Sequence, residues 1–452
     1  MPRGLVLVAL GAFFVVFNNA SLAQPTFAST LMSEDYLLAA RVLGHAFRDL
    51  NSTVPFVVFY TEEISGESLE ILESEGIKTI RVDRIESPFV DTHKATKYQY
   101  TKIRMWSHTE YTSIVHFDLD ALPLVDVSEL FRCGAFCASF RHSDKFNCGV
   151  FVLRPEQTAY KDLLSKISKL DSYDGGDQGF LNSYFADLKL APMFDPNATG
   201  RDQASLPLLR IPAEYNFDVG VYYLEGKMLI SPRIIHFTLG PLKPWIWWTY
   251  PLLDLNWKWN DVRASHMTKY NLPYLTTPQW IFQICVFAVP SLLKRYVIMK
   301  RGEILKRPTY VGDDYRRLGF GILALSIAIA FITNPSQLYP SMAWFLFFLK
   351  TLYYDLSLVQ AYSIAFIHRP VTKLEQFKFL ITYLPFTVIL WFLLYAITPP
   401  HPRFIVFVFG STFWLWIHCV RNHRMFTYYE YGKREIRYHQ VERVISNRKY
   451  ED

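Results

Sequence analysis

The sequence has few cysteines, five among 452 residues. Three of them, Cys133, Cys137 and Cys148, lie in its more polar first part, and an odd number of thiols cannot all pair with one another. Complete internal pairing is therefore excluded. Two alternatives stay open, one disulfide among the three or three buried free thiols. The other two, Cys285 and Cys419, lie in apolar segments.

The chain also lacks a basic face. Its net charge is +6, but lysines and arginines cluster between hydrophobic segments and do not line one side of a soluble domain. This distribution argues against a nucleic-acid partner and is typical of membrane topology, in which cytosolic loops are enriched in basic residues. Charges within the apolar segments are few, and the sequence has no paired broken-helix repeat, which argues against a transporter.

The first 23 residues are predicted to be a signal peptide or an uncleaved signal anchor. They carry a positive charge at Arg3, an apolar run over residues 5–17 and small residues at Ser21 and Ala23. Under both alternatives the following domain is lumenal. The glycosylation sequons at Asn51 and Asn197 agree with that placement.

Residues 24–264 alternate short β-rich runs with amphipathic stretches, a pattern that predicts an α/β domain with a largely parallel sheet. Strands are expected over residues 54–60, 113–117 and 149–153, and helices over residues 37–50 and 157–170.

Residues 279–420 are predicted to be an all-α, polytopic membrane region of about five helices. The apolar segments cover residues 280–293, 318–333, 342–367, 379–397 and 404–420. The first is short and contains Pro290, so an interfacial or re-entrant helix is the alternative to a crossing. The third is interrupted by Lys350 and Asp355.

Basic residues indicate the orientation of this region. They are concentrated in the loop at residues 294–317 and in the tail at 421–452, whereas the connections at 334–341 and 398–402 carry almost no charge. A lumenal α/β domain and a cytosolic tail satisfy the positive-inside rule.

Two aspartates end a hydrophobic strand in the sequence FDLD, residues 117–120. In an extended chain, positions i and i+2 point the same way, so Asp118 and Asp120 can address one hard cation together. Oxygen ligands favour magnesium or manganese. The alternative is an ordinary strand end followed by an acidic turn.

Three later motifs contain polar side chains suited to one ligand. Asn147 precedes a glycine at the mouth of a strand and can hydrogen-bond a sugar hydroxyl. Asp174, Asp177 and Gln178 lie in a glycine-flexed turn. The third motif, HFTLGPLKPW, offers a third metal ligand in His236, close backbone approach to a phosphate at Gly240 and a cation for a diphosphate leaving group in Lys243. Taken singly, a surface turn, a core histidine and a solvated lysine explain them equally well.

In this order the motifs resemble the retaining glycosyltransferase family that includes glycogenin. The resemblance begins around Tyr36, continues through the Tyr-Thr-Lys sequence that ends at Lys102, and ends at HFTLGPLKPW. It implies a GT-A type nucleotide-diphospho-sugar transferase domain with a Rossmann-like mixed sheet, and Mn²⁺ held by Asp118, Asp120 and His236. It also implies contact from Lys102 and Lys243 to the diphosphate of a UDP-sugar donor, and further donor contacts from Tyr36, Asn147, Asp174, Gln178 and Gly240, with Asp177 nearest the anomeric carbon. The chain has one more residue than glycogenin between His236 and Gly240.

Membrane segments set this chain apart from glycogenin, and the arrangement resembles the plant inositol phosphorylceramide glucuronosyltransferases, particularly over residues 242–253. That resemblance implies UDP-glucuronate as donor, a sphingolipid head group in a lipid bilayer as acceptor, and a multi-pass protein of the Golgi. Arg104 and Arg141 are candidate partners for the donor carboxylate.

The aromatic residues before the membrane part have two interpretations. They are suited to the lipid head-group zone, and they are equally suited to packing the domain onto its helices; they are Trp245, Trp247, Trp248, Tyr250, Trp257 and Trp259.

Other functions and mechanisms stay open. The enzyme is alternatively a hexosyltransferase that moves glucose or galactose from UDP to a glycan or glycoprotein, or the chain is a non-catalytic scaffold that binds nucleotide sugar. Retention requires either Asp177 as nucleophile or same-face attack guided by the departing phosphate.

Overall fold

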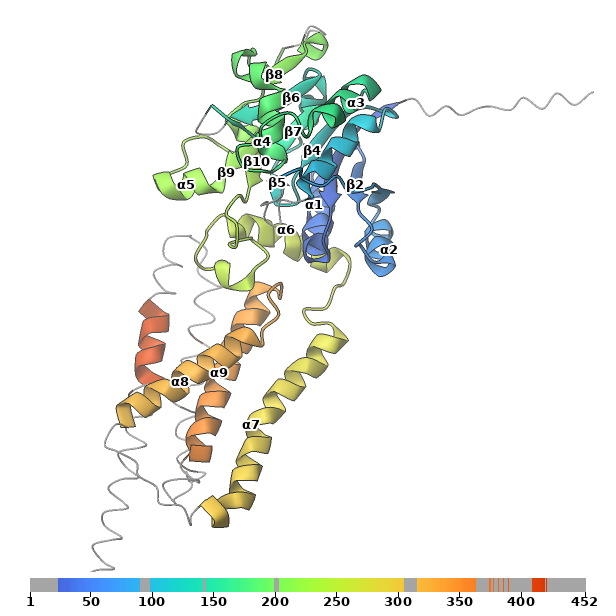
Figure 1. Cartoon of the computed structure of the whole chain (residues 1–452). Coiled ribbons are helices and arrows are strands. Elements are labelled where there is room, and N and C mark those ends of the chain that lie inside the picture. Colours follow the sequence, from blue (N-terminus) through green and yellow to red (C-terminus); the bar gives the residue numbers. More distant parts are fainter. Residues whose placement is uncertain are drawn as a thin grey trace, which may run out of the picture. The chain divides into compact units, whose positions relative to one another are not determined.

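The computed structural model describes residues 23–89, 98–140, 144–198, 203–304, 315–362 and 409–418, together with single positions at 374, 377, 381, 385, 389 and 420. The chain divides into two compact units. One holds the seven-stranded sheet, and the other includes residues 218–230 and the helices α6 to α9 (Figure 1).

The sheet of the first unit has the strand order β3-β2-β1-β4-β7-β6-β8. Its strands are β1 (Gln24–Leu31), β2 (Phe56–Tyr60), β3 (Lys78–Arg81), β4 (Tyr111–Phe117), β6 (Phe136–Phe140), β7 (Phe146–Leu153) and β8 (Leu208–Arg210). The strands expected at residues 54–60, 113–117 and 149–153 are confirmed as β2, β4 and β7.

The sheet is mixed. β1 pairs in parallel with β2 and β4, and β2 pairs in parallel with β3, but β7 is antiparallel to both β4 and β6. Only five residues separate β6 from β7, a connection too short for the crossover that parallel neighbours need. Every residue of β7 is buried, as expected for a strand covered on both faces.

The helices of this unit are α1 (Leu37–Asp49), α2 (Gly66–Ser74), α3 (Gln157–Lys166) and α4 (Asp177–Tyr184), and a long 3₁₀ segment, η2, covers Gln99–Ser107. The expected helices at 37–50 and 157–170 are confirmed, although α3 ends at Lys166. Aromatic packing fills the space beneath them; for example, the rings of Phe136 and Phe185 stack with centroids 3.8 Å apart.

One disulfide joins Cys133 and Cys137, and Cys148 is a buried free thiol. The first of the two open alternatives for the cysteines is therefore confirmed. Both sequon asparagines, Asn51 and Asn197, are exposed.

A second, three-stranded sheet has the order β5-β10-β9, with β5 at Ala121–Pro123, β9 at Phe217–Asp218 and β10 at Ile234–His236. Helix α5 (Val219–Glu225) lies between β9 and β10 in the sequence.

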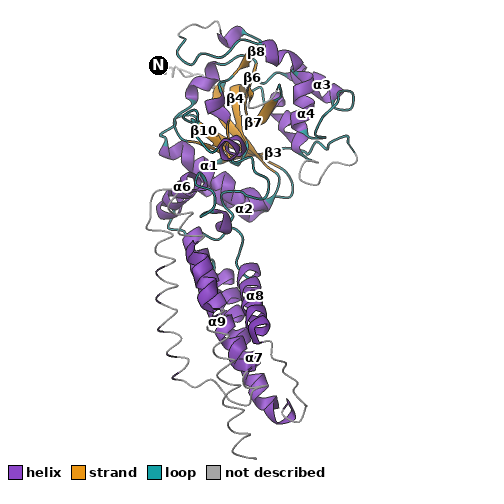
Figure 2. Cartoon of the chain, turned by 90° about the vertical axis from the view of Figure 1, so that its left-hand side faces the viewer, coloured by secondary structure: helices purple, strands orange, loops and turns teal. Residues whose placement is uncertain are grey.

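Besides α5, the other unit contains the helices α6 (Asn256–Lys269), α7 (Thr277–Ile304), α8 (Tyr315–Ile332) and α9 (Pro340–Tyr362). Helix α9 packs beside both α7 and α8 (Figure 2). Two helical stretches, Thr277–Lys300 and Pro340–Tyr362, are long and apolar enough to cross a membrane, and the apolar stretch Leu318–Ile332 is shorter.

Helix α7 corrects two expectations about the first apolar segment. The helix continues through Pro290 and reaches Ile304, so it is not short, and residues 294–304 are helical and not part of a loop. Lysine and arginine are good helix formers, so the basic residues that end the apolar run do not end the helix.

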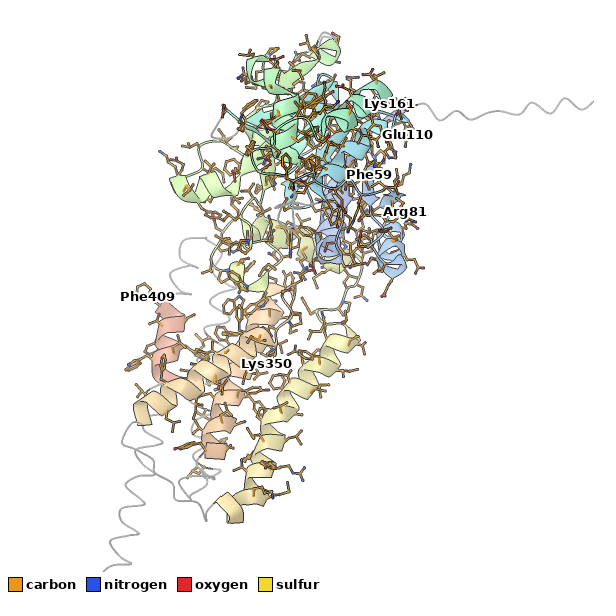
Figure 3. All side chains as sticks on the ribbon, viewed as in Figure 1. Phe59, Arg81, Glu110, Lys161, Lys350 and Phe409 are labelled. Atoms are coloured by element: carbon orange, nitrogen blue, oxygen red, sulfur yellow. A yellow bond between two sulfur atoms is a disulfide. The ribbon has the colours of Figure 1, made fainter. Side chains whose placement is uncertain are left out.

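The two charges in the third apolar segment are accommodated by neighbouring helices. Lys350 is fully buried in α9, and its ammonium group donates to Gln283 Oε1 and Thr333 Oγ1, each at 3.0 Å (Figure 3). The carboxylate of Asp355 lies 3.0 Å from Nδ1 of His418. Both charges therefore have specific polar partners within the apolar helices.

Aromatic residues after β10 pack onto these helices. Trp247 is buried and makes an edge-on contact with Trp344 of α9, and its backbone N–H donates to Ser336 O at 3.1 Å. Trp245 packs against Trp259 of α6. These contacts support the packing interpretation for Trp247, whereas Trp245 and Trp259 contact each other.

Several expectations lie outside the described residues. The signal sequence is expected over residues 1–23, of which residues 1–22 are not described. The tail at 421–452 and Arg141 are not described either. The segments at 379–397 and 404–420 are described only in part, so the count of crossings stays a prediction.

Candidate donor and metal site

Asp118 immediately follows β4, at the carboxyl edge of the parallel strands. Its backbone N–H donates to Gly149 O at 2.7 Å, and its carbonyl accepts from Ala121 N at 2.8 Å, so a tight turn connects β4 to β5. Asp118 is half-buried and Asp120 is buried. Both carboxylates lie at the end of the strand as predicted, but residues 118–120 form a turn and not the extended chain from which their common direction was inferred.

Asp118, Asp120 and His236, the last residue of β10, form a candidate metal site. One ligand atom from each lies within 4.8 Å of the other two. Two ligands bound about 2.1 Å from one ion are about 3.0 to 4.2 Å apart, so only a small closure is needed to hold a cation. Two carboxylates and an imidazole are suitable donors for a divalent ion such as manganese.

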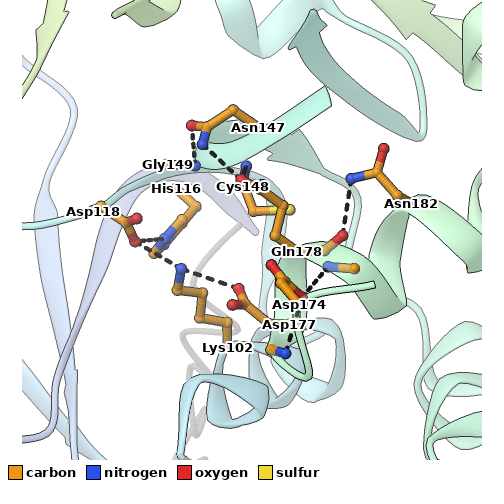
Figure 4. Close-up of polar contacts among 12 residues, drawn as sticks. Lys102, His116, Asp118, Asn147, Cys148, Gly149, Asp174, Asp177, Gln178 and Asn182 are labelled. Carbon is orange, nitrogen blue, oxygen red and sulfur yellow. Dashed lines mark hydrogen bonds and ion pairs between the residues drawn. The ribbon is translucent and has the colours of Figure 1, made fainter. Parts of the chain in front are cut away.

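Lys102, from η2, connects two acidic residues of the site. Its ammonium nitrogen lies 2.8 Å from Asp118 Oδ1 and 3.1 Å from Asp177 Oδ2 (Figure 4). Burial alone would lower the pKa of Lys102, but the two carboxylates outweigh it and raise the pKa above its usual value. The lysine is therefore a fixed positive charge at neutral pH.

Asp177 is the first residue of α4, and its side chain is almost completely buried. Burial raises the pKa of its carboxyl group, and the Lys102 ammonium opposes this rise without cancelling it. The helix N-terminus and Lys102 both favour negative charge at this position.

His116 is a further member of the site that the sequence reasoning missed. Its Nε2 lies 3.1 Å from Asp118 Oδ1, and the ring is completely buried in β4. Its position two residues before Asp118 was the available signal, since i and i+2 share one face of a strand. Lys102 and His116 together orient the Asp118 carboxylate.

Asn147 and Gln178 meet as the sequence predicts, and Asn216 joins them. The Asn147 amide nitrogen donates to Gln178 Oε1 at 2.6 Å, and its oxygen accepts from Gly149 N and from Asn216 Nδ2, both at 2.9 Å. The Gln178 amide nitrogen donates to Tyr173 OH at 2.6 Å. Asn216 is completely buried, and no pattern around it in the sequence had singled it out.

Asp174 holds the loop before α4. Its Oδ1 accepts from Gly176 N at 2.9 Å, from Gly179 N at 3.0 Å and from the Ser172 hydroxyl at 2.8 Å. A Cβ at Gly179 would lie 2.5 Å from that carboxylate oxygen, so only glycine fits. This oxygen of Asp174 therefore maintains the backbone that presents Asp177.

Of the remaining predicted donor residues, Gly240 and Lys243 lie on one loop after β10, and Tyr36 lies on another after β1. Lys243 donates to Phe237 O at 2.8 Å, Gly240 is exposed with open space beside it, and Tyr36 is partly exposed in the 3₁₀ turn Glu34–Tyr36 after β1. Their contacts with a donor stay predictions.

Arg104 faces another part of the domain. Its guanidinium donates to Asp83 O at 3.0 Å and to Tyr160 OH at 2.5 Å. These contacts give no support to a role for Arg104 at a donor carboxylate.

Comparison with known proteins adds independent information. No protein-family model matches the chain. Inositol phosphorylceramide glucuronosyltransferase 1 of Arabidopsis thaliana is 36% identical over 251 residues, which are 54% of this chain and 46% of that relative. The match thus spans less than half of that relative's length.

Two other relatives match longer parts. The Arabidopsis thaliana protein named "Putative glucuronosyltransferase PGSIP7" is 30% identical over 348 residues, 72% of this chain and 68% of the relative. Human glycogenin-1 is 28% identical over 295 residues, 62% of this chain and 77% of glycogenin-1. The chain has a GT-A-like glycosyltransferase fold with a mixed sheet and a helical C-terminal region, and it is a UDP-sugar glycosyltransferase. It belongs to the glycogenin-like retaining glycosyltransferase family 8, in the subgroup that resembles the plant inositol phosphorylceramide glucuronosyltransferases.

Proposed function

We propose that this protein is a retaining glucuronosyltransferase that moves glucuronate from UDP-glucuronate onto the head group of a membrane lipid such as inositol phosphorylceramide. The observation that carries the catalytic part is the buried contact of Lys102 with both Asp118 and Asp177, next to the Asp118, Asp120 and His236 cluster. The names of the relatives support glucuronate as the transferred sugar.

The metal site fits the first task of the reaction, which is to stabilise the departing diphosphate. A divalent ion held by Asp118, Asp120 and His236, for which we propose Mn²⁺, would supply Lewis-acid charge neutralisation to the diphosphate. Lys102 is a fixed cation beside the same carboxylates, and Lys243 is the second cation assigned to the diphosphate. Tyr36 and Gly240 complete the proposed donor contacts.

We assign the sugar to the polar side chains of Asn147, Asp177 and Gln178. Asn147 and Gln178 are bonded to one another, so each holds the other's amide in a fixed orientation for hydrogen bonds to sugar hydroxyls. Asp177 is the buried carboxylate beside Lys102, and we place it nearest the anomeric carbon. Its negative charge suits stabilisation of the positive charge that develops there.

The lipid acceptor rests on a different observation. The chain that contains the site also contains two helices long and apolar enough to cross a membrane. The substrate-binding surface and the membrane helices are therefore parts of one molecule. The name of one relative specifies inositol phosphorylceramide as its acceptor. We propose a multi-pass Golgi protein with the α/β domain in the lumen.

A product analysis with the full-length protein in lipid nanodiscs tests the proposal. Nanodiscs with inositol phosphorylceramide, ceramide or neither are incubated with Mn²⁺ and with UDP-glucuronate, UDP-glucose or UDP-galactose, and lipids are analysed by mass spectrometry. We expect a lipid product carrying one glucuronate only when inositol phosphorylceramide and UDP-glucuronate are both present. The Asp120→Asn variant is the inactive control.

Other outcomes identify the alternatives. Transfer of glucose or galactose to an added glycan, with no lipid product, would replace the proposal by a hexosyltransferase. Binding of UDP-sugar with no turnover on any acceptor would indicate a non-catalytic scaffold.

A further inference from the structure

Helix α5 and the turn that follows it form an exposed apolar tip, residues 224–230. The exposed fractions of its four large apolar side chains are 88% for Leu224, 44% for Met228, 66% for Leu229 and 38% for Ile230. Among the described residues before α7, no other stretch of seven residues exposes as many large apolar side chains. An apolar cluster of this kind is typical of a contact surface.

The base of α5 is held firmly by polar contacts. Asp218 caps the helix by accepting from Gly220 N at 2.8 Å, and its carboxylate also accepts from the Thr238 hydroxyl. Tyr222 OH donates to Asp254 Oδ2 at 2.9 Å, and Tyr223 OH accepts from Leu255 N at 3.1 Å. The tip is therefore presented by an anchored helix, and its exposure does not come from a loose end.

We propose that the tip, residues 224–230, inserts into the lumenal interface of the same bilayer that the helices α7 and α9 span. Residues 218–230 and these helices belong to one compact unit, which ties the tip to the membrane part of the chain. The tip carries Glu225 and Lys227 and so has no net charge; its affinity for lipid comes from the apolar side chains.

The residues around the base of α5 are also suited to an interface. Tyr222 and Tyr223 are half-buried and keep hydroxyl groups in hydrogen bonds, and the partner segment at Asp254 and Leu255 adjoins the half-buried Trp257. Aromatic rings with one polar end concentrate at the level of lipid head groups. The apolar tip therefore has a base of aromatic residues whose hydroxyl groups are hydrogen-bonded, as expected for an element that enters the interface.

The same contacts connect the tip to the proposed catalytic machinery. Thr238, which donates to Asp218, lies two residues after the candidate metal ligand His236. Insertion of the tip would therefore fix the His236 loop relative to the lipid surface, where a lipid acceptor presents its head group. This second step rests on the proposed function, whereas insertion itself does not.

Fluorescence at single labelled positions tests insertion in the full-length protein. In a Cys285→Ser, Cys419→Ser background, Leu229→Cys is labelled with an environment-sensitive dye, and Leu190→Cys, at a residue that is 79% exposed in the α/β unit, is the matched control. Nanodiscs with and without nitroxide-labelled lipid are compared. We expect emission from position 229 to be shifted to the blue and quenched about twofold, with no change at position 190.

Equal, unquenched emission at both positions would overturn the inference. A blue shift at position 229 that occurs only when two copies of the chain associate would overturn it as well. The activity arm uses Leu229→Glu: we expect a higher KM for the lipid acceptor and an unchanged KM for UDP-glucuronate. Quenching at 229 without any lipid product would contradict the proposed function and leave insertion standing. A lipid product without quenching at position 229 would contradict insertion and leave the proposed function standing.

Discussion

The ammonium group of Lys102 lies 2.8 Å from Oδ1 of Asp118, and the lysine side chain is only 6% exposed. The same nitrogen contacts Asp177, which is also buried, so one cation neutralises two carboxylates away from solvent. Removal of this lysine leaves a buried negative charge without its partner.

Lys102→Met should therefore lose both stability and activity. Breaking a buried ion pair by removing one partner costs roughly 3–5 kcal/mol of unfolding free energy, and loss of the cation should lower kcat for UDP release by about 100-fold. The double variant with Lys102→Met and Asp177→Asn should recover most of the stability without recovering activity. Thermal unfolding and UDP release measure the two effects, and equal stability of the single and double variants would contradict this assignment.

Asn216 should act as a positioning residue, because its amide nitrogen holds the Asn147 oxygen at 2.9 Å. In Asn216→Ala the Asn147 amide loses a partner, so we expect kcat with UDP-glucuronate to fall about tenfold and unfolding free energy to fall by about 1–3 kcal/mol.

Asn256→Ala is the matched control, since Asn256 is equally buried but donates to Thr249 in the other unit. It should lose comparable stability and keep its kcat. A tenfold loss of kcat in both variants would mean that Asn216 has only a structural role.

Gly179→Ala should disrupt the loop that presents Asp177. The added Cβ would lie 2.3 Å from Ser172 Oγ and 2.6 Å from Tyr173 N, in addition to its contact with Asp174. Overpacking of this kind costs about 1–3 kcal/mol, and we expect weaker donor binding as well. Gly66→Ala is the control, because nothing lies within 4 Å of its Cβ position at the start of α2, and it should be neutral or slightly stabilising.

Glu34 should make stability sensitive to acid. Its carboxylate accepts from Ser65 N and the Ser68 hydroxyl, both at 2.6 Å, at the N-terminus of α2. Burial raises the pKa of Glu34, but these hydrogen bonds outweigh it and lower the pKa below the ordinary value of 4.5. A lowered folded-state pKa stabilises the protein above the unfolded-state value, and this contribution is lost as pH falls through the folded-state value.

The difference in Tm between the wild type and Glu34→Gln should accordingly be largest near neutral pH and shrink below about pH 4.5. Because Glu34 is exposed, solvent screening keeps the effect small, below about 1 kcal/mol. Glu70→Gln, at an exposed residue of α2, should show a smaller difference at neutral pH. A Tm difference between the wild type and Glu34→Gln that grows as the pH falls would contradict this assignment.

The sequence predicted the elements whose signal is local. The strands β2, β4 and β7 are buried runs rich in apolar residues. Asp118 and Asp120 come together as expected, but through the tight turn after β4 and not through extended chain. The mixed sheet implied by the family resemblance is confirmed, but the direction of β7 itself could not be predicted from its residues, because strand periodicity contains no information about pairing. Only the short connection from β6 could have indicated an antiparallel pair.

Buried polar partners were less predictable. His116 and Asn216 carry no composition signal, since each is defined by a contact with a residue that a different strand or turn brings near. The contact of Lys102 with Asp177 spans 75 positions of sequence and depends on the packing of η2 against α4. The sequence placed the end of the first apolar segment at residue 293, because hydropathy shows only where apolar residues end. The backbone continues as helix through residues 294–304.

The most direct measurement is the initial rate of UDP release from UDP-glucuronate by the full-length protein in nanodiscs, titrated with Mn²⁺ after treatment with a chelator. For the wild type we predict almost no UDP release without metal and a saturable recovery with Mn²⁺. For Asp120→Asn we predict a rate at least about 100-fold lower at every metal concentration, because a ligand of the proposed ion is lost. A metal-independent rate, or an Asp120→Asn titration that overlays that of the wild type, would contradict the assignment of Asp118, Asp120 and His236 as the metal corner of a sugar-transfer site.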